Sequence, residues 1–296
     1  MDKPGPMRGK VVVVTGATSG IGRIAAEALA AQGARIIVIA RDPRRADSTL
    51  ARLRTLGAQG ALGAENALGA PGAHQALIAD LSSLRDTKEV GARIAAQEPR
   101  IDVLINNAGN VFARRGVTAD GLERTFALNH MAYFVLTHRL RERLLAAAPA
   151  RIVNTASGAH SGNSLDFDDL QMERRYRALT AYGRSKLANI LFTRELARRL
   201  AGTGVTANCL HPGFVATGLG QRGAGIFGAM VRVAMLFAGS PERGAKTIIH
   251  LAAAPEAATA TGGYYIDCRA AQPSGAAQDE AAARRLWEES VRLAGL

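Results

Sequence analysis

Several features are scarce in this chain, and each absence narrows its class. Two cysteines in 296 residues cannot build a disulfide framework. Cys209 and Cys268 are therefore interpreted as small buried residues, and a cytoplasmic location is expected. An aromatic content of 5% disfavours a base-stacking protein. The histidines lack metal-ligand spacing apart from a weak pair, His130 and His138, so no metal site is predicted.

Long apolar runs are also missing. The polar N-terminus is followed by only four valines, and residues 225–238 are too short and are interrupted by Arg232, so no signal peptide or transmembrane segment is expected. The net charge of +12 is compatible with a nucleic-acid binder. The excess is mostly arginine at helical spacing, as in residues 139–143 and 194–199. We interpret these residues as solvated helix faces and expect no nucleic-acid partner.

Short apolar runs alternate with longer segments of helical period, which is typical of buried parallel strands and covering helices. The pattern predicts an α/β fold, a Rossmann-type doubly wound parallel sheet flanked by helices. Residues 9–296 are expected to form a single domain after an N-terminal extension, residues 1–8. A surface-loop insertion is expected at residues 57–73. The expected strands are residues 11–14, 35–39, 76–78, 103–105, 151–154, 205–210 and 263–266, and the expected helices are residues 21–32, 84–97, 119–145, 181–201 and 241–253.

The first chemical motif is a glycine-rich turn, Thr-Gly-Ala-Thr-Ser-Gly-Ile-Gly, at residues 15–22. Gly16 allows a sharp turn off the strand, Gly20 allows a pyrophosphate to approach the backbone, and Gly22 allows the helix to pack close to the sheet. The start of the helix offers free N–H groups and a positive dipole end to phosphates. The motif therefore predicts a dinucleotide site, with a purely structural strand–helix turn as the alternative.

The second motif serves proton transfer. Reducing a carbonyl with hydride requires an acid at its oxygen, and oxidising an alcohol requires the matching base. A phenol is a poor base at pH 7 unless a cation lies beside it, and a lysine four residues later on a helix supplies one. Of the five tyrosines, only Tyr182 has such a lysine, Lys186. Because such a spacing also arises by chance, the motif needs support from other residues.

These motifs resemble the short-chain dehydrogenase/reductase family, which has the same Gly-x-x-x-Gly-x-Gly spacing. The resemblance covers about residues 9–296 and is strongest to retinol dehydrogenase-like members, through residues 151–160, 166–176 and 263–268. It implies a catalytic tetrad in which Tyr182 is the general acid/base, Ser157 bonds the substrate oxygen, and Asn129 holds a water that links Lys186 to solvent. Ser157 could instead be a polar strand end, and Asn129 a helix-kinking residue.

The resemblance also implies a nicotinamide cofactor. Arg41, directly after the second strand, favours NADP(H) over NAD(H), although a shift in register would bring Asp42 to the ribose. Members of the family usually have a second basic residue within the glycine loop, and Ser19 occupies that position here. Asp80 matches an adenine-binding position or caps the next helix. His211, beside the nicotinamide segment, is interpreted as structural. The implied cofactor contacts are Gly16, Ser19, Gly20, Ile21, Gly22, Arg41, Asp80, Leu81, Asn107, Ala108, Gly109, Tyr182, Lys186, Pro212, Gly213 and Thr217.

Residues 218–240 lie where the family has a substrate lid, and they are strongly apolar; core packing of a helix is the alternative. A lid of this kind predicts a hydrophobic aldehyde, ketone or alcohol as substrate. The leading hypothesis is an NADP(H)-dependent oxidoreductase. The alternatives are an NAD-dependent alcohol dehydrogenase of the same family and, in another class, a non-catalytic dinucleotide-binding regulator. The family also implies a homo-oligomer built on the helices that carry Asn129 and Tyr182.

Overall fold

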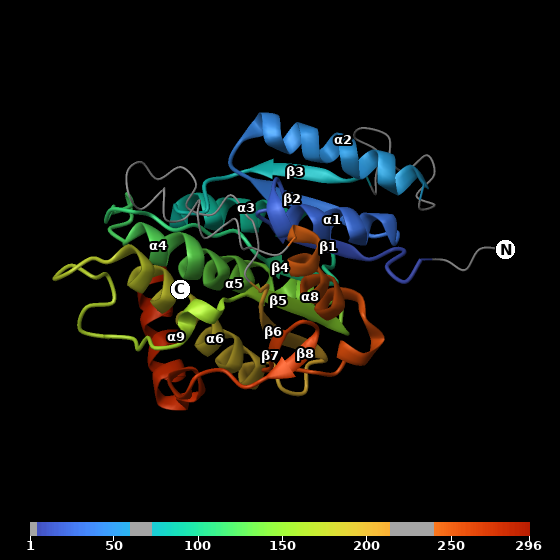
Figure 1. Cartoon of the computed structure of the whole chain (residues 1–296). Coiled ribbons are helices and arrows are strands. Elements are labelled where there is room, and N and C mark those ends of the chain that lie inside the picture. Colours follow the sequence, from blue (N-terminus) through green and yellow to red (C-terminus); the bar gives the residue numbers. More distant parts are fainter. Residues whose placement is uncertain (1–4, 60–72, 214–239) are drawn as a thin grey trace.

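A computed structural model describes residues 5–59, 73–213 and 240–296 and contains an eight-stranded sheet with helices on both faces (Figure 1). The strand order is β3-β2-β1-β4-β5-β6-β7-β8. The strands are β1 (Val11–Thr15), β2 (Arg35–Ala40), β3 (Gln75–Ile78), β4 (Val103–Asn106), β5 (Ala150–Thr155), β6 (Val205–His211), β7 (Tyr264–Ile266) and β8 (Arg269–Ala271). The described α-helices are α1 (Gly20–Ala31), α2 (Pro43–Gln59), α3 (Leu84–Gln97), α4 (Arg124–Phe126), α5 (Ala132–Leu145), α6 (Ala178–Arg199), α8 (Pro241–Ala253) and α9 (Glu280–Ala294).

The expected Rossmann-type fold is confirmed, with one correction to the sheet. The seven expected strands are all present and parallel. The eighth strand, β8, pairs antiparallel with β7. Its residues, Arg-Ala-Ala, are exposed or half-buried, so they carry no apolar pattern that marks a strand. From β1 the chain adds β2 and β3 on one side and then returns to add β4 on the other side of β1, so the order of the strands reverses between β1 and β4. In such sheets ligands bind at the carboxyl ends of the strands beside this point.

The strands are apolar throughout because the sheet is covered on both faces. Val12 and Val14 of β1 pack with α1, α2 and α8, whereas Val13 packs with α3, α5 and α6. All three valines are fully buried. Successive side chains of a strand point to opposite faces, so a doubly covered strand must be apolar at every position.

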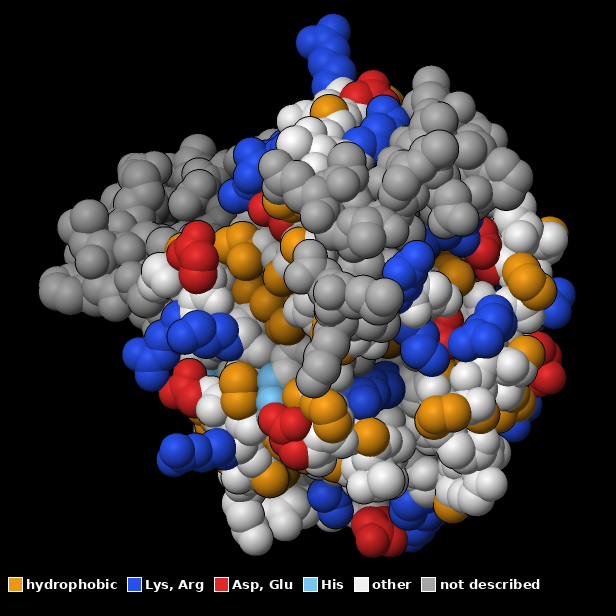
Figure 2. Space-filling view, turned by 90° about the vertical axis from the view of Figure 1, so that its right-hand side faces the viewer, with side chains coloured by type: hydrophobic (Ala, Val, Ile, Leu, Met, Phe, Trp, Pro, Cys, Tyr) orange, Lys and Arg blue, Asp and Glu red, His pale blue; other side chains and the backbone are white. Residues whose placement is uncertain are grey.

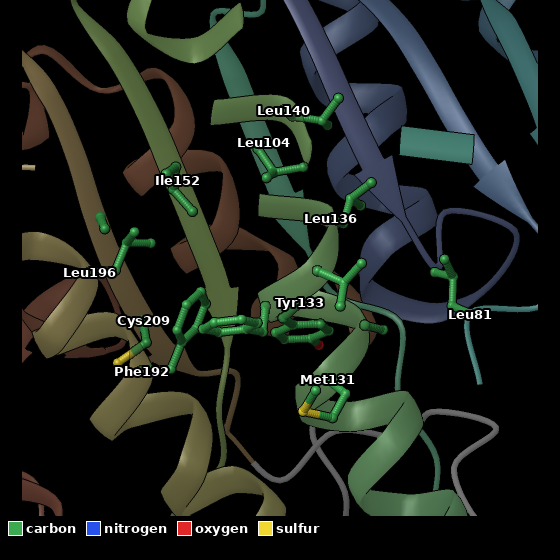
Figure 3. Packing of buried hydrophobic residues seen from close by; sticks show 14 of the residues in the cluster. Leu81, Leu104, Met131, Tyr133, Leu136, Leu140, Ile152, Phe192, Leu196 and Cys209 are labelled. Atoms are coloured by element: carbon green, nitrogen blue, oxygen red, sulfur yellow. The ribbon is translucent and has the colours of Figure 1, made fainter. Parts of the chain in front are cut away.

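The core on the α5–α6 face is built from leucines and aromatic rings (Figure 3). In this cluster Leu136 and Leu140 of α5 lie on the same side as Leu104 of β4, and Phe192 of α6 lies beside Cys209 of β6. Phe134 and Phe192 have their ring centroids 5.6 Å apart. This packing holds α5 and α6 against the sheet and so fixes α6, which carries Tyr182 and Lys186, and the start of α5, directly after the turn that carries Asn129.

The expected helix at residues 119–145 is wrong at its start. Val117 and Glu123 form a β-bridge, and the Glu123 carboxylate accepts hydrogen bonds from the N–H groups of Thr125 and Phe126 at 2.7 and 2.8 Å. This cap starts the helix at Arg124. A π-helical turn, Ala127–Met131, then separates α4 from α5.

Other boundaries also differ from expectation. Residues 57–59 belong to α2, and the rest of the expected loop up to residue 72 lies outside the described residues, as do Thr217 and residues 218–239 of the expected lid. Met7 is 4% exposed and packs in the core, ahead of the expected domain start at residue 9. Cys268 is only half-buried, in a left-handed turn between β7 and β8, so its interpretation as a buried residue is wrong.

None of the helices in the described ranges is long and apolar enough to span a bilayer. On the face shown in Figure 2, the basic side chains stand apart from one another, with acidic and apolar side chains between them. On this face the charges do not merge into one continuous basic band.

Candidate active site

Asn107 joins the ends of β1, β4 and β5, at the point where the strand order of the sheet reverses. Its side-chain amide donates to the carbonyls of Thr15 and Gly16 at 3.2 and 3.3 Å, and its side-chain oxygen accepts from Thr155 at 3.3 Å. The Thr15 hydroxyl accepts from the N–H groups of Asn107 and Ala108 at 2.8 and 3.0 Å. The glycine turn is thereby tied to the ends of β4 and β5.

The glycines of the turn are required by close packing. Gly16 has a φ of +69°, and a Cβ there would lie 2.9 Å from the Ala108 Cα. A Cβ on Gly22 would lie 2.3 Å from the Asn107 amide nitrogen and 2.5 Å from the Gly16 carbonyl oxygen. Gly20 has a φ of +55°. Gly22 therefore brings the helix against the turn and Asn107 as well as against the sheet.

The start of α1 fits an anionic group. Ser19 stands at the N-cap without a side-chain capping bond, and the first turn has no acidic side chain. Ile21 is buried, which anchors the helix, while Ser19 is exposed. The backbone N–H groups of this turn have no side-chain acceptor among the described residues, so they can bind phosphate oxygens. These features fit the pyrophosphate of a dinucleotide.

At the end of β2, Arg41 is exposed and Asp42 has a structural task. Asp42 Oδ1 accepts from the Arg45 N–H at 3.2 Å, at the start of α2. This bond directs the carboxylate toward the helix. Arg41, which directly follows β2, is exposed as well, and the ends of such strands are where a dinucleotide binds in sheets of this kind.

Asp80 follows β3 and does not cap α3. Its Oδ1 accepts from the Ser82 N–H and hydroxyl at 2.9 and 2.8 Å, whereas Ser83 is the N-cap of α3 and accepts from the Asp86 N–H. Leu81 is 6% exposed and belongs to the core. The capping alternative for Asp80 is therefore wrong, and its adenine-binding role stays a prediction.

Asn129 lies in the π-helical turn and is fully buried. Its side chain accepts from the Asn110 N–H at 2.9 Å and donates to the Asn110 carbonyl and to the Ser185 hydroxyl. Its backbone carbonyl accepts from the Asn189 side chain at 2.9 Å. The π-turn agrees with a helix-distorting role, and it also places this amide between the segment after β4 and α6.

Lys186 and Tyr182 project from the first turns of α6. Lys186 is 2% exposed, and its Nζ donates to the Thr155 carbonyl at 2.8 Å and lies 5.6 Å from the Tyr182 ring centroid. A Cβ on Gly109 would lie 3.5 Å from this Nζ and 3.2 Å from Asn129 Oδ1. The backbone after β4 thus passes directly over the lysine and the asparagine.

Burial shifts both ionisable groups. It lowers the pKa of Lys186 to about 7. It raises the pKa of Tyr182 to about 12, against the opposing effect of a side-chain hydrogen bond with Ser157. The tyrosine therefore keeps its proton near neutral pH, and the hydroxyls of Tyr182 and Ser157 lie close together.

Two supporting groups were missed by sequence reasoning. Ser157 caps a short 3₁₀ turn, Gly158–His160, and the buried His160 ring bonds the Ser157 carbonyl at 2.7 Å while its Nε2 accepts from the Ser274 N–H at 3.1 Å. Ser185 donates to the Tyr182 carbonyl at 2.7 Å. Both groups hold the backbone of a tetrad residue. The position of Ser185 directly before Lys186 was the available signal, whereas nothing in the sequence linked His160 to Ser274.

A row of buried polar side chains crosses the core beneath the site. The Asn106 amide donates to Asn154 Oδ1 at 2.9 Å, the Asn154 amide donates to the Thr193 hydroxyl at 2.9 Å, and that hydroxyl donates to the Asn189 carbonyl at 2.6 Å. The first bond joins β4 to β5 and the second joins β5 to α6, whereas the third lies within α6. The row fixes the register of the strand ends that carry Asn107 and Ser157.

The segment after β6 lies at the same edge of the sheet. Pro212 and Gly213 are half-buried, and Gly213 has a φ of +80°. The His211 ring packs against Gly158, where a Cβ would lie 3.2 Å from its Nε2. Burial, assisted by His160, lowers the pKa of His211 and keeps the ring neutral. The described contacts of His211 are packing contacts, in keeping with its structural interpretation.

The sequence profile of the short chain dehydrogenase family matches residues 10–224. The chain belongs to this family. Human retinol dehydrogenase 14 is 42% identical to this dehydrogenase, over 99% of the present chain and 88% of the human protein.

Solved structures agree with this assignment. The Pseudomonas aeruginosa RhlG/NADP active-site complex has a TM-score of 0.67 and 27% identity, covering 89% of this chain and 96% of that one. A short chain dehydrogenase from Burkholderia cenocepacia in complex with NADP has a TM-score of 0.66 and 26% identity, covering 88% and 96%. The chain is therefore an oxidoreductase whose fold binds a nicotinamide dinucleotide.

Proposed function

We propose that this dehydrogenase transfers hydride between NADP(H) and a hydrophobic aldehyde or ketone, or the corresponding alcohol, with Tyr182 as general acid/base. The convergence of Asn129, Tyr182 and Lys186 beside the Gly109 backbone carries the proposal. Together with Gly109 these groups come from three segments, the π-helical turn, α6 and the residues after β4, and they meet at the carboxyl edge of the sheet, next to the glycine-rich turn. Burying the Lys186 ammonium group costs desolvation free energy, so core packing alone does not explain a lysine at that place.

The proposed mechanism assigns one task to each side chain. The nicotinamide, when bound, supplies or accepts the hydride. In reduction, Tyr182 donates its hydroxyl proton to the carbonyl oxygen while Ser157 bonds the same oxygen. Lys186, held by the Thr155 carbonyl, stabilises the phenolate that results. Because Tyr182 stays protonated in the neutral range, reduction needs no prior deprotonation, whereas alcohol oxidation should speed up as the pH rises.

The choice of NADP over NAD rests on Arg41. It is the exposed cation at the end of β2, and the neighbouring Asp42 carboxylate is engaged at the start of α2. Two structural relatives are named as NADP complexes. Arg41→Asp should reduce the ratio of NADPH to NADH efficiency by at least about ten-fold, since it replaces a cation near the phosphate with an anion. An unchanged ratio would assign the selectivity elsewhere.

The substrate class rests on the apolar composition of residues 218–240 and on the retinol dehydrogenase name of a relative. A spectrophotometric screen of hydrophobic aldehydes, ketones and alcohols, retinal included, with NADPH/NADP and NADH/NAD tests it directly. We expect turnover with apolar carbonyls and little with charged metabolites. A preference for charged or sugar substrates would contradict this part of the proposal.

The variant Tyr182→Phe distinguishes a catalytic oxidoreductase from a non-catalytic dinucleotide-binding regulator. Turnover should fall by about three orders of magnitude because the proton donor is lost, while NADPH binding by fluorescence stays near wild type. Tyr176→Phe is the matched control: its hydroxyl bonds Thr125 and the Phe112 carbonyl, so its loss should leave turnover largely intact. Wild-type turnover in Tyr182→Phe would refute the mechanism. NADPH binding without turnover in the wild-type protein would favour the non-catalytic regulator.

A further inference from the structure

A cavity of about 320 Å³ lies between α5, α6 and the first residues of β5 and β6. It is distinct from the candidate active site. Leu196 on its wall follows Tyr182 by 14 residues on α6, which corresponds to about 21 Å along the helix. Val205 and Ile152 on the wall lie near the amino ends of their strands, whereas the active site lies at the carboxyl ends.

The walls of the cavity are apolar. Phe134, Ile152, Phe192 and Leu196 line it and are nearly fully buried. Trp287 of α9 closes one side, with its ring 5.0 Å from that of Phe134 and 5.9 Å from that of Phe192. An apolar lining that borders a space of this size fits a flexible hydrocarbon chain.

The cavity also has a basic margin. Arg141 and Arg199 line it with side chains that are 47% and 46% exposed, and the Arg199 guanidinium lies over the Trp287 ring, 4.4 Å from its centroid. Arg199 shares the Glu195 carboxylate with Arg198, and Arg141 pairs with the highly exposed Glu142. Three guanidinium groups therefore face two carboxylates, and a net positive charge remains.

His138 lines the same margin, and its ring favours the neutral form. Burial, and then the charges of Arg139 and Arg141, lower its pKa. Because it is neutral near pH 7, His138 can donate a hydrogen bond to a head group without adding to the charge. The two arginines supply the electrostatic attraction.

We propose that this cavity binds an amphiphile with a carboxylate head and a medium-length alkyl chain, the chain lying between α5 and α6 and the head at Arg141 and Arg199. The family resemblance predicts that a second copy would cover this face. In this chain, however, α9 already lies on that face, with the Trp287 ring against Phe134 and Phe192, which leaves less of it for a second copy. The net positive charge at the margin favours an anionic ligand. The site does not depend on the proposed catalytic function.

Trp287 is the only tryptophan in the chain, so its fluorescence reports on this cavity alone. Titration of the full chain with decanoate, below its micelle concentration, should change the Trp287 emission saturably. Decan-1-ol, with the same chain and no charge, should bind more weakly, and acetate should not bind. Tyr182→Phe should bind decanoate as the wild type does, which separates this site from the catalytic one.

Two variants test the two halves of the site. Arg141→Gln should weaken decanoate binding about five-fold and abolish its advantage over decan-1-ol. Arg85→Gln is the matched control, because Arg85 is also an exposed helical arginine paired with the next residue, Asp86, but is remote from the cavity. Leu196→Phe should fill the space and prevent binding, with folding checked by thermal melting and turnover unchanged.

Three results would overturn the proposal. One is the absence of any saturable Trp287 response. Another is equal binding of decanoate and decan-1-ol that Arg141→Gln leaves unaltered. The third is a dimer in light scattering that Leu196→Phe or Arg141→Gln dissociates, since this would show that a second copy occupies the face.

Discussion

The two ends of α6 differ in the side chains that they bury. Near its start, Ser185, Lys186 and Asn189 are buried and each makes a hydrogen bond to a neighbouring segment. Near its end, Leu196 is buried beside the α5–α6 cavity, and Arg199 reaches solvent. Polar groups that are buried with partners hold one geometry, whereas apolar walls around a space tolerate different occupants.

The largest effect is expected at the catalytic end. Lys186→Met should lower turnover by about two to three orders of magnitude, because it removes the cation that we propose stabilises the Tyr182 phenolate. Stability should not fall, since the substitution removes a buried ammonium. Steady-state kinetics and thermal melting measure the two effects. A variant that loses stability and keeps its turnover would reverse the assignment.

Lys186 also gives a pH signature. Its pKa is about 7 in the folded protein against 10.5 as a free side chain, so between these values the unfolded chain binds the extra proton. Stability should therefore rise with pH across this window through Lys186, and Lys186→Met should flatten that rise.

Low pH should weaken the contact between the π-helical turn that carries His130 and helix α9. Burial lowers the pKa of His130 to about 4, and its Nε2 bonds the Ser290 hydroxyl of α9 at 2.9 Å. The unfolded chain takes up this proton near pH 6.5, so stability falls from there to about pH 4, by roughly 3 kcal/mol for this histidine. Urea unfolding at several pH values measures the slope. His130→Gln should reduce it, and an identical slope would exclude this cause.

Asn189→Ala tests the polar end by stability. Its amide donates to the Asn129 and Thr155 carbonyls at 2.9 and 3.3 Å, and removing it leaves both carbonyls buried with a lost partner, at a cost of about 2–3 kcal/mol. Asn163→Ala is the matched control, since its amide also bonds two carbonyls at 2.9 and 3.3 Å but near the surface. It should cost less than about 1 kcal/mol. Equal unfolding free energies would show that burial is not the deciding factor.

The smallest contrast compares two leucines of α6. Leu187→Ala, in the packed region beside Lys186, should cost about 4 kcal/mol, and Leu196→Ala, beside the existing cavity, about 2–3 kcal/mol. Only Leu187→Ala should also reduce turnover. Chemical denaturation and activity assays check both variants, and a larger cost at Leu196 would contradict the view that its surroundings are loosely packed.

Sequence reasoning worked best where the cause was local. Valines on consecutive positions marked β1, and the glycine spacing marked the turn that follows it. It failed where distant groups decide the structure. The Glu123 cap makes the helix begin at Arg124, later than expected, and antiparallel pairing with β7 makes Arg-Ala-Ala the strand β8. No local pattern indicates these events, because the bonds form only after the chain has folded.

Local sequence patterns were enough to predict the alternating strands and helices, the glycine-rich turn and the shared helix face of Tyr182 and Lys186. Hydrophobic periodicity and backbone sterics act over a few residues, so they can be interpreted directly. The folded chain was needed to find that Asn107 joins three strand ends and that burial shifts the pKa of Lys186 and Tyr182. It was also needed to find that α9 closes a cavity with a basic margin. Hydrogen bonds across the sheet, desolvation and cavities depend on residues far apart in the chain, which meet only in the folded protein.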